Sequence, residues 1–392
     1  MAELDLHAVQ AALREQEIDA WLFYDHHGRD PLAYRVLGLP AAAHVTRRWY
    51  YLIPARGEPK KLVHRIEAGK LDALPGAKTG YSSWQELESA LEAMLAGHTR
   101  IAMQYSPRNA IMYVSMVDAG TVELVRSWGK EVVSSADLIA RFEAVLTAEQ
   151  IASHYAAQRA IDDILPTAWQ WLRAELDAGR EPSEYTVQQW LAEAMRRESL
   201  VWEHGPNVSV NENSANSHYD PNAERARAIR DGDFLLVDIW GRQNTPGAIF
   251  YDITWTGTVG RAPFEREQVV FNTVRDARDA AIAAVQQAFA ADRPIAGWEP
   301  DAAARALITE AGFGPQFTHR TGHNIATELH GSGAHLDDLE THDERRILPN
   351  TCFSVEPGVY LDNFGIRSEV NIITSAREAV VTGRVQTKLL RI

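Results

Sequence analysis

Acidic residues stand inside two pairs of otherwise apolar, strand-like segments, and this pattern restricts the fold more than any other feature of the chain. The first pair is FLLVDIWG with AIFYDITWTG, and the connection between them carries turn residues at Asn244–Gly247. A hairpin centred on position 245 places Asp238 opposite Asp252. Directly opposed side chains have Cβ atoms about 4.5–5.5 Å apart, where two like charges repel each other. The pattern therefore predicts two carboxylates held together within an apolar sheet.

The second pair, CFSVEPGVY with GIRSEVNIIT, repeats the arrangement, because a turn at Asp362 and Asn363 places Glu356 opposite Glu369. Burying unpaired carboxylates is costly, and Arg367 can offset only part of four such charges. Two divalent metal ions balance all four carboxylates and, with one imidazole, form a plausible dinuclear site with ions about 3.5–4 Å apart. A register slip or bulge would break this geometry, so each acid taken singly can also be a solvated carboxylate on an edge strand.

The rest of the sequence predicts two domains. A chain of 392 residues, of which 45% are hydrophobic, is long enough for two cores. The first part alternates strand-like and helix-like segments, including a hairpin over 47–64 and a helix over 109–129, which is typical of an α/β domain. A capping-box sequence at Thr147 then opens a long helix in which Pro166 predicts a kink. We expect one domain at 1–146 and a second, with long helices and strand pairs, at 147–392.

Charge and hydropathy argue against some classes of partner. The net charge is −14 and Lys and Arg form no cluster, which argues against nucleic acid. No run of 18 apolar residues occurs, and acids interrupt the region where a signal peptide would be apolar. We expect a cytoplasmic protein without membrane association that acts on small molecules or peptides. The single cysteine, Cys352, lies in an apolar run, where we expect a packing role.

Several short motifs resemble a known enzyme family. VDIW, YDITWT, TGHNI, ELHG, SVEPGVY and GIRSEV resemble the dinuclear metallopeptidases of the pita-bread fold. These include prolidase (Xaa-Pro dipeptidase), aminopeptidase P and methionine aminopeptidase, with metal-free creatinase as a relative. The resemblance implies a creatinase-like α/β N-terminal domain followed by an α+β pita-bread catalytic domain. It also implies five metal ligands, which are Asp238, Asp252, His323, Glu356 and Glu369.

The stretch THRTGHNIATELHGSGAH holds four histidines, to which the resemblance gives different roles. Besides the ligand His323, it implies that His330 and, from an earlier segment, His218 face the substrate and donate to the oxyanion or to the substrate carboxylate. His319 matches a histidine of the prolidase and aminopeptidase P branch, so we expect it to bind substrate or support the site, although a bland structural role stays open. His335 matches no family role, and we expect it in a surface loop.

The resemblance implies hydrolysis of Xaa-Pro bonds, with a hydroxide bridging two metal ions as nucleophile and Glu356 as proton shuttle. The oxygen-rich ligand set favours Mn²⁺, with Co²⁺ and Zn²⁺ as alternatives. Arg367 matches a substrate-binding arginine, and Arg345 and Arg346 lie near places where prolidases recognise a dipeptide carboxylate, which favours a dipeptidase. Relatives with two such domains are commonly homodimers, so a homodimer is expected.

Other functions remain possible at this stage. An aminopeptidase P acting on longer peptides would use the same ligands, whereas a metal-free creatinase-like hydrolase or a non-catalytic binding module would not need all five. Trp255 replaces an arginine of the usual Asp-Ile-Thr-Arg run, so the chain departs from the family within a predicted ligand-bearing strand. Asn350 replaces a glycine of the family, an exchange that asparagine tolerates if its φ is positive.

Overall fold

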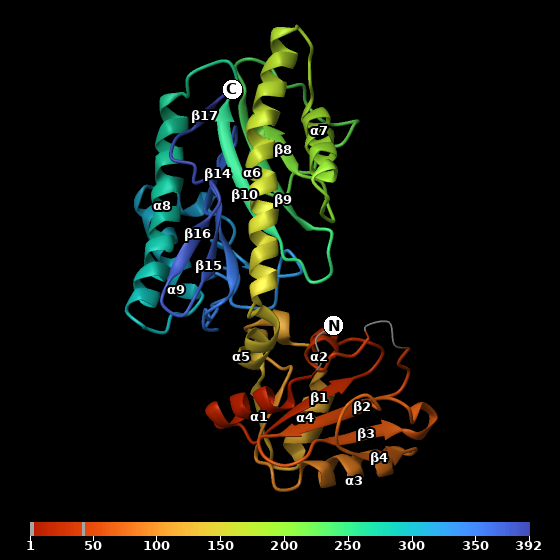
Figure 1. The fold of residues 1–392 in the computed structure, drawn as a ribbon. Coiled ribbons are helices and arrows are strands. Elements are labelled where there is room, and N and C mark those ends of the chain that lie inside the picture. The colour runs from red at the N-terminus through yellow and green to blue at the C-terminus, as the bar shows by residue number, and fades with distance from the viewer. Residues whose placement is uncertain (1–3, 41–43) are drawn as a thin grey trace. The chain divides into compact units, whose positions relative to one another are not determined.

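The computed structural model describes residues 4–40 and 44–392, and the chain divides into two compact units (Figure 1). The first unit ends at Glu143 and the second begins at Ala144. The expected boundary, between residues 146 and 147, falls among the first residues of the second unit. Within the described residues no helix is both long enough and apolar enough to cross a membrane.

The first unit is a six-stranded sheet in the order β4-β3-β2-β1-β5-β6. Strand β1 is antiparallel to β2 and parallel to β5, and every residue of β1 and β2 is buried because helices cover both faces of the sheet. The strands are β1 (Ala20–Asp25), β2 (Trp49–Pro54), β3 (Lys60–His64), β4 (Ala77–Tyr81), β5 (Arg100–Met103) and β6 (Glu131–Ser134), and the helices are α1 (Leu6–Glu15), α2 (Pro31–Val36), α3 (Trp84–Leu95), α4 (Ala119–Ser127) and α5 (Ala136–Ile139).

The predicted hairpin over 47–64 is confirmed as β2 paired with β3, with Gly57 at φ 97° in the turn. The predicted helix over 109–129 is wrong in its first half. Asn109, at the end of a 3-10 turn, has φ 55°, a second 3-10 turn follows at Met112–Val114, and α4 begins only at Ala119. The reason is local, because the Asp118 side chain caps the first turn of α4 and fixes its start.

The second unit contains two main sheets and a short strand pair. The sheet β17-β10-β9-β7, with β8 also on β9, packs against α6 and α7, and the sheet β11-β12-β15-β16 packs against α8 and α9. The helices are α6 (Ala148–Asp177), α7 (Glu184–Arg197), α8 (Glu265–Ala290) and α9 (Trp298–Glu310), and the strands are β7 (Leu200–Val201), β8 (Asn207–Val210), β9 (Phe234–Gln243), β10 (Tyr251–Thr258), β11 (Asn324–Ile325), β12 (Cys352–Val355), β13 (Gly358–Tyr360), β14 (Gly365–Arg367), β15 (Val370–Thr374), β16 (Ala379–Thr382) and β17 (Leu390–Arg391).

Helix α6 begins as the sequence predicts. The Thr147 side chain accepts from the backbone of Gln150, and the Gln150 side chain accepts from the backbone of Thr147, so the capping box is confirmed. The helix then continues past Pro166 to Asp177 as one element, the long yellow helix of Figure 1.

The register of the first acidic hairpin differs from the prediction. Asp238 lies opposite Thr254, and Asp252 lies opposite Trp240. The connection spans residues 244–250 instead of a tight turn, because the residues just before β10 do not pair with β9 and the Phe250 N–H donates to another loop. The pairing is displaced by two positions, so both acids keep the same face of the sheet and become diagonal neighbours.

The register of the second acidic hairpin is confirmed. Val355 pairs with Val370 on one side, and Gly358 pairs with Arg367 on the other. Glu356 and Glu369 lie between these two pairs, in the register that the turn predicts. Asn350, just before β12, has φ 60°, which is the condition under which asparagine tolerates the exchange.

Candidate metal centre

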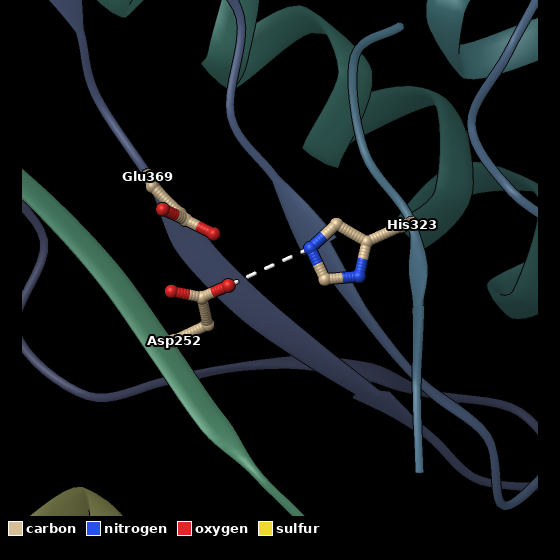
Figure 2. Close-up of side chains that lie close together, drawn as sticks. All are labelled: Asp252, His323 and Glu369. Atoms are coloured by element: carbon tan, nitrogen blue, oxygen red, sulfur yellow. Dashed lines mark ion pairs between the residues drawn. The ribbon is translucent and has the colours of Figure 1, made fainter. Parts of the chain in front are cut away.

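Three side chains from separate elements converge at the centre of the second unit. Asp252 comes from β10, His323 from the segment before β11, and Glu369 from the segment between β14 and β15. One ligand atom from each lies within 4.8 Å of the other two, and the three side chains point toward one another (Figure 2). Metal–ligand bonds of about 2.0–2.2 Å leave donors on opposite sides of an ion about 4.4 Å apart, so this spacing fits a divalent ion.

Asn371 joins the two sheets at this point. Its side-chain Oδ1 accepts from the Asp252 N–H at 2.9 Å, and its Nδ2 donates to the Asp252 carbonyl at 2.8 Å. The Glu369 N–H points at the Thr254 carbonyl at 3.4 Å. These contacts fix β10 against β15 and bring the two buried carboxylates together.

The hydrogen bonds of His323 leave one ring nitrogen available. Its Nδ1 lies 3.3 Å from the Asn324 carbonyl, to which only a protonated Nδ1 can donate. The Nε2 lone pair then faces Asp252 Oδ2 at 3.5 Å and Glu356 Oε1 at 3.4 Å. A backbone carbonyl on one nitrogen and a free lone pair on the other is typical of a metal-binding imidazole.

The other two predicted ligands border this cluster. Glu356 Oε1 accepts from the Ser354 hydroxyl at 3.0 Å, and Asp238 Oδ2 pairs with Arg367 Nη2 at 2.5 Å. The Thr254 hydroxyl accepts from Arg367 Nε at 3.0 Å and lies 3.1 Å from Asp238 Oδ1, within reach of a donated hydrogen bond. All five predicted ligands therefore lie in one connected group.

The buried carboxyl groups of this group repel one another, and a positive charge between them would stabilise their ionised form. Burial, followed by repulsion from Asp238 and Glu356, raises the pKa of Asp252 well above its usual range, and burial together with Asp252 does the same to Glu369. Asp252 Oδ1 and Glu369 Oε1 are buried without a hydrogen-bond partner. Buried oxygens without donors, beside an imidazole lone pair, are the donor set that divalent ions bind, so the residues fit the expected metal.

Of the two predicted substrate-facing histidines, His330 lies beside this group. His330 meets His323 edge to face, with ring centroids 4.3 Å apart. Repulsion from His323, followed by burial of the ring and by the charges of Arg320 and His218, lowers the pKa of His330. Both His218 and His330 are exposed. The site thus has an open side that carries imidazole side chains.

His319 is engaged inside the protein. Its Nδ1 lies 2.7 Å from the Arg320 carbonyl, and its Nε2 lies 2.7 Å from the Tyr360 hydroxyl. The carbonyl can only accept, so Nε2 accepts from Tyr360, whose oxygen in turn accepts from Arg367 Nη1 at 3.0 Å. His319 therefore supports the orientation of Arg367, and a direct contact with substrate stays a prediction.

His335 is not in a surface loop, and that prediction is wrong. The residue has 0% of its surface exposed, and its Nδ1 accepts from the Asn324 N–H at 3.0 Å. The backbone N–H of His335 donates to the Asp343 carboxylate, which also accepts hydrogen bonds from the buried guanidinium of Arg345. The sequence signal failed because this segment has no strand or helix periodicity, although its backbone is packed inside the unit. Arg345 is 2% exposed, so its expected place near a substrate carboxylate is not supported.

Trp255 points away from the metal centre. Alternation along β10 places Asp252 and Thr254 on one face and Trp255 on the other, where its indole packs in the core beneath α6 and α7. The replacement of an arginine by tryptophan at this position therefore changes the layer behind the sheet.

Sequence reasoning missed four supporting residues. Three of them stand two positions from a predicted ligand, so the period of a strand could have found them as polar residues on the ligand-bearing face. The fourth follows Glu356 by four positions and carries the hydroxyl between His319 and Arg367. These residues are Thr254, Ser354, Asn371 and Tyr360.

Comparison with known proteins identifies the family. A sequence profile of metallopeptidase family M24 matches residues 152–376. The chain is 26% identical over 338 residues to the probable dipeptidase PepE of Mycobacterium tuberculosis H37Rv, covering 84% of this chain and 81% of the relative. It is 30% identical to the Xaa-Pro dipeptidase of Lactobacillus delbrueckii subsp. lactis over 163 residues, covering 41% and 40% of the two chains.

The fold matches solved structures over its whole length. The crystal structure of dipeptidase PepE from Mycobacterium ulcerans covers 100% of each chain with a TM-score of 0.69 at 21% identity. The expected architecture, an α/β domain followed by a pita-bread domain, is thereby confirmed. Because the family profile spans more than half of the sequence, this chain belongs to metallopeptidase family M24.

Proposed function

We propose that this metallopeptidase hydrolyses Xaa-Pro dipeptides. The observation that carries the proposal is the connected group of the five predicted ligands, in which Asp252, His323 and Glu369 converge and two buried carboxylate oxygens have no donor. The names of several relatives, Xaa-Pro dipeptidase and probable dipeptidase, support this substrate class. Hydrolysis adds water across the peptide bond, with hydroxyl joining the carbonyl carbon and a proton joining the leaving nitrogen.

Two divalent ions are proposed at the predicted ligands, where bound ions lower the pKa of water and polarise a carbonyl. Asp252, His323 and Glu369 would hold one ion, and the other would be completed by the two ligands at the border of the group. Mn²⁺ is the preferred candidate, because four of the five side chains offer carboxylate oxygens, and Co²⁺ and Zn²⁺ are alternatives. Binding requires the carboxyl groups to lose their protons, so affinity should rise with pH.

Glu356 is the proposed proton shuttle. Its side chain is 16% exposed, against 7% for Asp252, so it can exchange protons with the substrate side of the site. Asp238 is similarly accessible, but its Oδ2 is committed to Arg367 at 2.5 Å, whereas Glu356 lies 3.8 Å from that guanidinium. Glu356 is thus the ligand most able to take a proton from water and deliver it to the leaving nitrogen.

His218 and His330 are the proposed donors to the substrate. A neutral imidazole retains one N–H, which can stabilise the developing oxyanion or bind the substrate carboxylate. Arg367 is proposed to orient Asp238 and to add positive charge at the substrate side. Proline has no N–H and a fixed φ, so an Xaa-Pro bond offers a distinct shape to such a site.

The proposal extends to assembly and location: a homodimer in the cytoplasm. The expectation of a dimer comes from the resemblance to two-domain prolidases, and the absence of a spanning helix among the described residues is compatible with a cytoplasmic place. Size-exclusion chromatography with light scattering tests the first statement, and a monomeric mass would remove it.

The test of function compares an Xaa-Pro dipeptide with an Xaa-Pro-Yaa tripeptide after chelation and after addition of Mn²⁺. We expect no hydrolysis by the chelated protein, recovery with Mn²⁺, and a higher kcat/KM for the dipeptide. A preference for the tripeptide would favour an aminopeptidase P, an alternative strengthened by the burial of Arg345. Hydrolysis without metal would rule out the mechanism.

A further inference from the structure

A buried carboxylate outside the metal centre organises the segment that carries His218. Glu184 is the first residue of α7, and 0% of its surface is exposed. A buried carboxylate is tolerated only when hydrogen bonds replace its water, and this one collects four donors. They are Val210 N at 2.8 Å, Asn213 Nδ2 at 2.9 Å, Tyr219 Oη at 2.6 Å and Arg227 N at 2.8 Å.

Two of these donors enclose His218 in the sequence. Asn213 precedes it and Tyr219 follows it directly, so one carboxylate closes the loop that has His218 at its exposed end. Inside this loop the His218 N–H lies 3.1 Å from Asn216 Oδ1, and the Tyr219 N–H lies 3.0 Å from the Asn216 carbonyl. A loop tied at both ends and turned on itself loses most of its conformational freedom, which orients the histidine backbone.

Further contacts tie the same loop to its surroundings. Gln188, on the next turn of α7, donates to the Pro206 carbonyl at 3.0 Å and to Asp220 Oδ1 at 3.1 Å. On the other side, Ser214 accepts from the Gly365 N–H at 2.8 Å. Gly365 opens β14, the strand that ends at Arg367, so the loop is fixed to α7 and to the metal-centre hairpin together.

We propose that Glu184 is a positioning residue for His218, holding both ends of segment 213–219 so that the imidazole keeps its place at the exposed end of this loop. The inference rests on the proposed function, in which His218 contacts the substrate. Glu184 itself touches neither the substrate nor the predicted metal ligands. Its action passes through the Tyr219 hydroxyl and the Asn213 amide.

The charge of Glu184 is required as well as its shape. Oε1 serves the Val210 N–H, and Oε2 serves the Arg227 N–H and the Tyr219 hydroxyl. A glutamine has one oxygen, so either orientation of its amide sets an NH₂ group against one of the two backbone N–H donors. The variant Glu184→Gln keeps the volume and loosens the segment.

The experiment is a double-mutant cycle of Glu184→Gln and His218→Asn in the metal-loaded protein. We expect Glu184→Gln to lower kcat/KM on an Xaa-Pro dipeptide by about 10-fold or more, with metal content unchanged. If Glu184 acts through His218, the double variant is no slower than His218→Asn alone, within about 2-fold. Additive losses would overturn the proposal.

A second readout and a control separate positioning from general stability. Hydrogen exchange of segment 207–227 should accelerate in Glu184→Gln. The control is Glu267→Gln. Glu267 is also a buried carboxylate of the second unit, and it accepts hydrogen bonds from the Arg261 guanidinium and from the Phe264 N–H at the start of α8. It should lower the melting temperature without changing kcat/KM or the exchange of 207–227. Equal effects of both variants would contradict a specific role.

The role of Glu184 can still be tested if Glu184→Gln does not fold or if the wild-type protein is inactive on Xaa-Pro peptides. If Glu184→Gln does not fold, Tyr219→Phe replaces it in the cycle, because this change removes only the tie next to His218. If the wild-type protein hydrolyses no Xaa-Pro peptide, the proposed function fails before any variant is assayed, and exchange of 207–227 still decides whether Glu184 orders the segment. Unchanged hydrogen exchange of segment 207–227 in both Glu184→Gln and Tyr219→Phe would contradict the proposal.

Discussion

Replacing Asp252 by asparagine should stabilise the metal-free protein while abolishing metal binding. Burial and neighbouring carboxylates raise the pKa of Asp252 and Glu369 in the folded chain, whereas their usual values are 3.8 and 4.5. Above about pH 4 the folded, metal-free protein therefore holds protons that the unfolded chain has released. The contribution of these two carboxyls to the free energy of unfolding therefore falls as the pH rises, by about 1.4 kcal/mol per pH unit for each carboxyl that keeps its proton.

The variant Asp252→Asn removes one of these protons. Its stability should decline with pH more gently than that of the wild type, by up to about 1.4 kcal/mol per pH unit, over the range where Asp252 stays protonated. Urea unfolding in the presence of chelator, at several pH values between about 5 and 8, measures both slopes. Asp362→Asn, at an exposed turn, is the matched control and should follow the wild type.

With bound metal, the wild type should be more stable than Asp252→Asn, the reverse of the order expected without metal. Saturating Mn²⁺ stabilises a protein that binds it in the folded state only, and the gain should grow with pH because the ligands must lose protons. Asp252→Asn should gain little from Mn²⁺. Parallel pH slopes for the metal-free wild type and Asp252→Asn, or equal stabilisation of both by Mn²⁺, would refute this account of the site.

Three further predictions concern single side chains. His154 is fully buried, which lowers its pKa from 6.5 to about 4. The neutral ring therefore contributes stability above about pH 6.5, and about 3 kcal/mol of it is lost as the pH falls to 4. Urea unfolding at both pH values should show this loss in the wild type and not in His154→Gln. His330→Asn should lower kcat/KM about 100-fold while elemental analysis finds unchanged metal, and a loss of metal would point to a structural role instead. Arg367→Lys should lower kcat/KM by a similar factor, because one ammonium cannot reach Asp238 and Tyr360 together; full activity would argue against an orienting role.

The ligand-bearing strands could be predicted because charge in an apolar strand has few physical solutions. The acids, their shared faces and the second hairpin's register all followed from alternation and turn position. The register of β9 with β10 could not be predicted, because the centre of a seven-residue connection depends on contacts that Phe250 makes outside the hairpin. Because the predicted register differs from the observed one by two positions, an even number, both acids still lie on the same face of the sheet.

The histidines show a different limit of sequence reasoning. His323 was recognised by its motif, whereas His335 was expected at the surface and lies fully buried. The segment between them has no period, and its place depends on Asn324 and Asp343, which are brought there by tertiary packing. Similarly, nothing in the local sequence around His319 indicates the Tyr360 hydroxyl that occupies its Nε2.

We propose that the buried acids and His323 bind a pair of divalent ions that this protein needs for peptide hydrolysis. The deciding measurement is a titration of the chelated protein with Mn²⁺, with hydrolysis of an Xaa-Pro dipeptide followed at each addition. We expect about two ions to bind per chain and activity to appear only as they bind. Binding of no metal, or full activity before the first addition, would contradict this proposal.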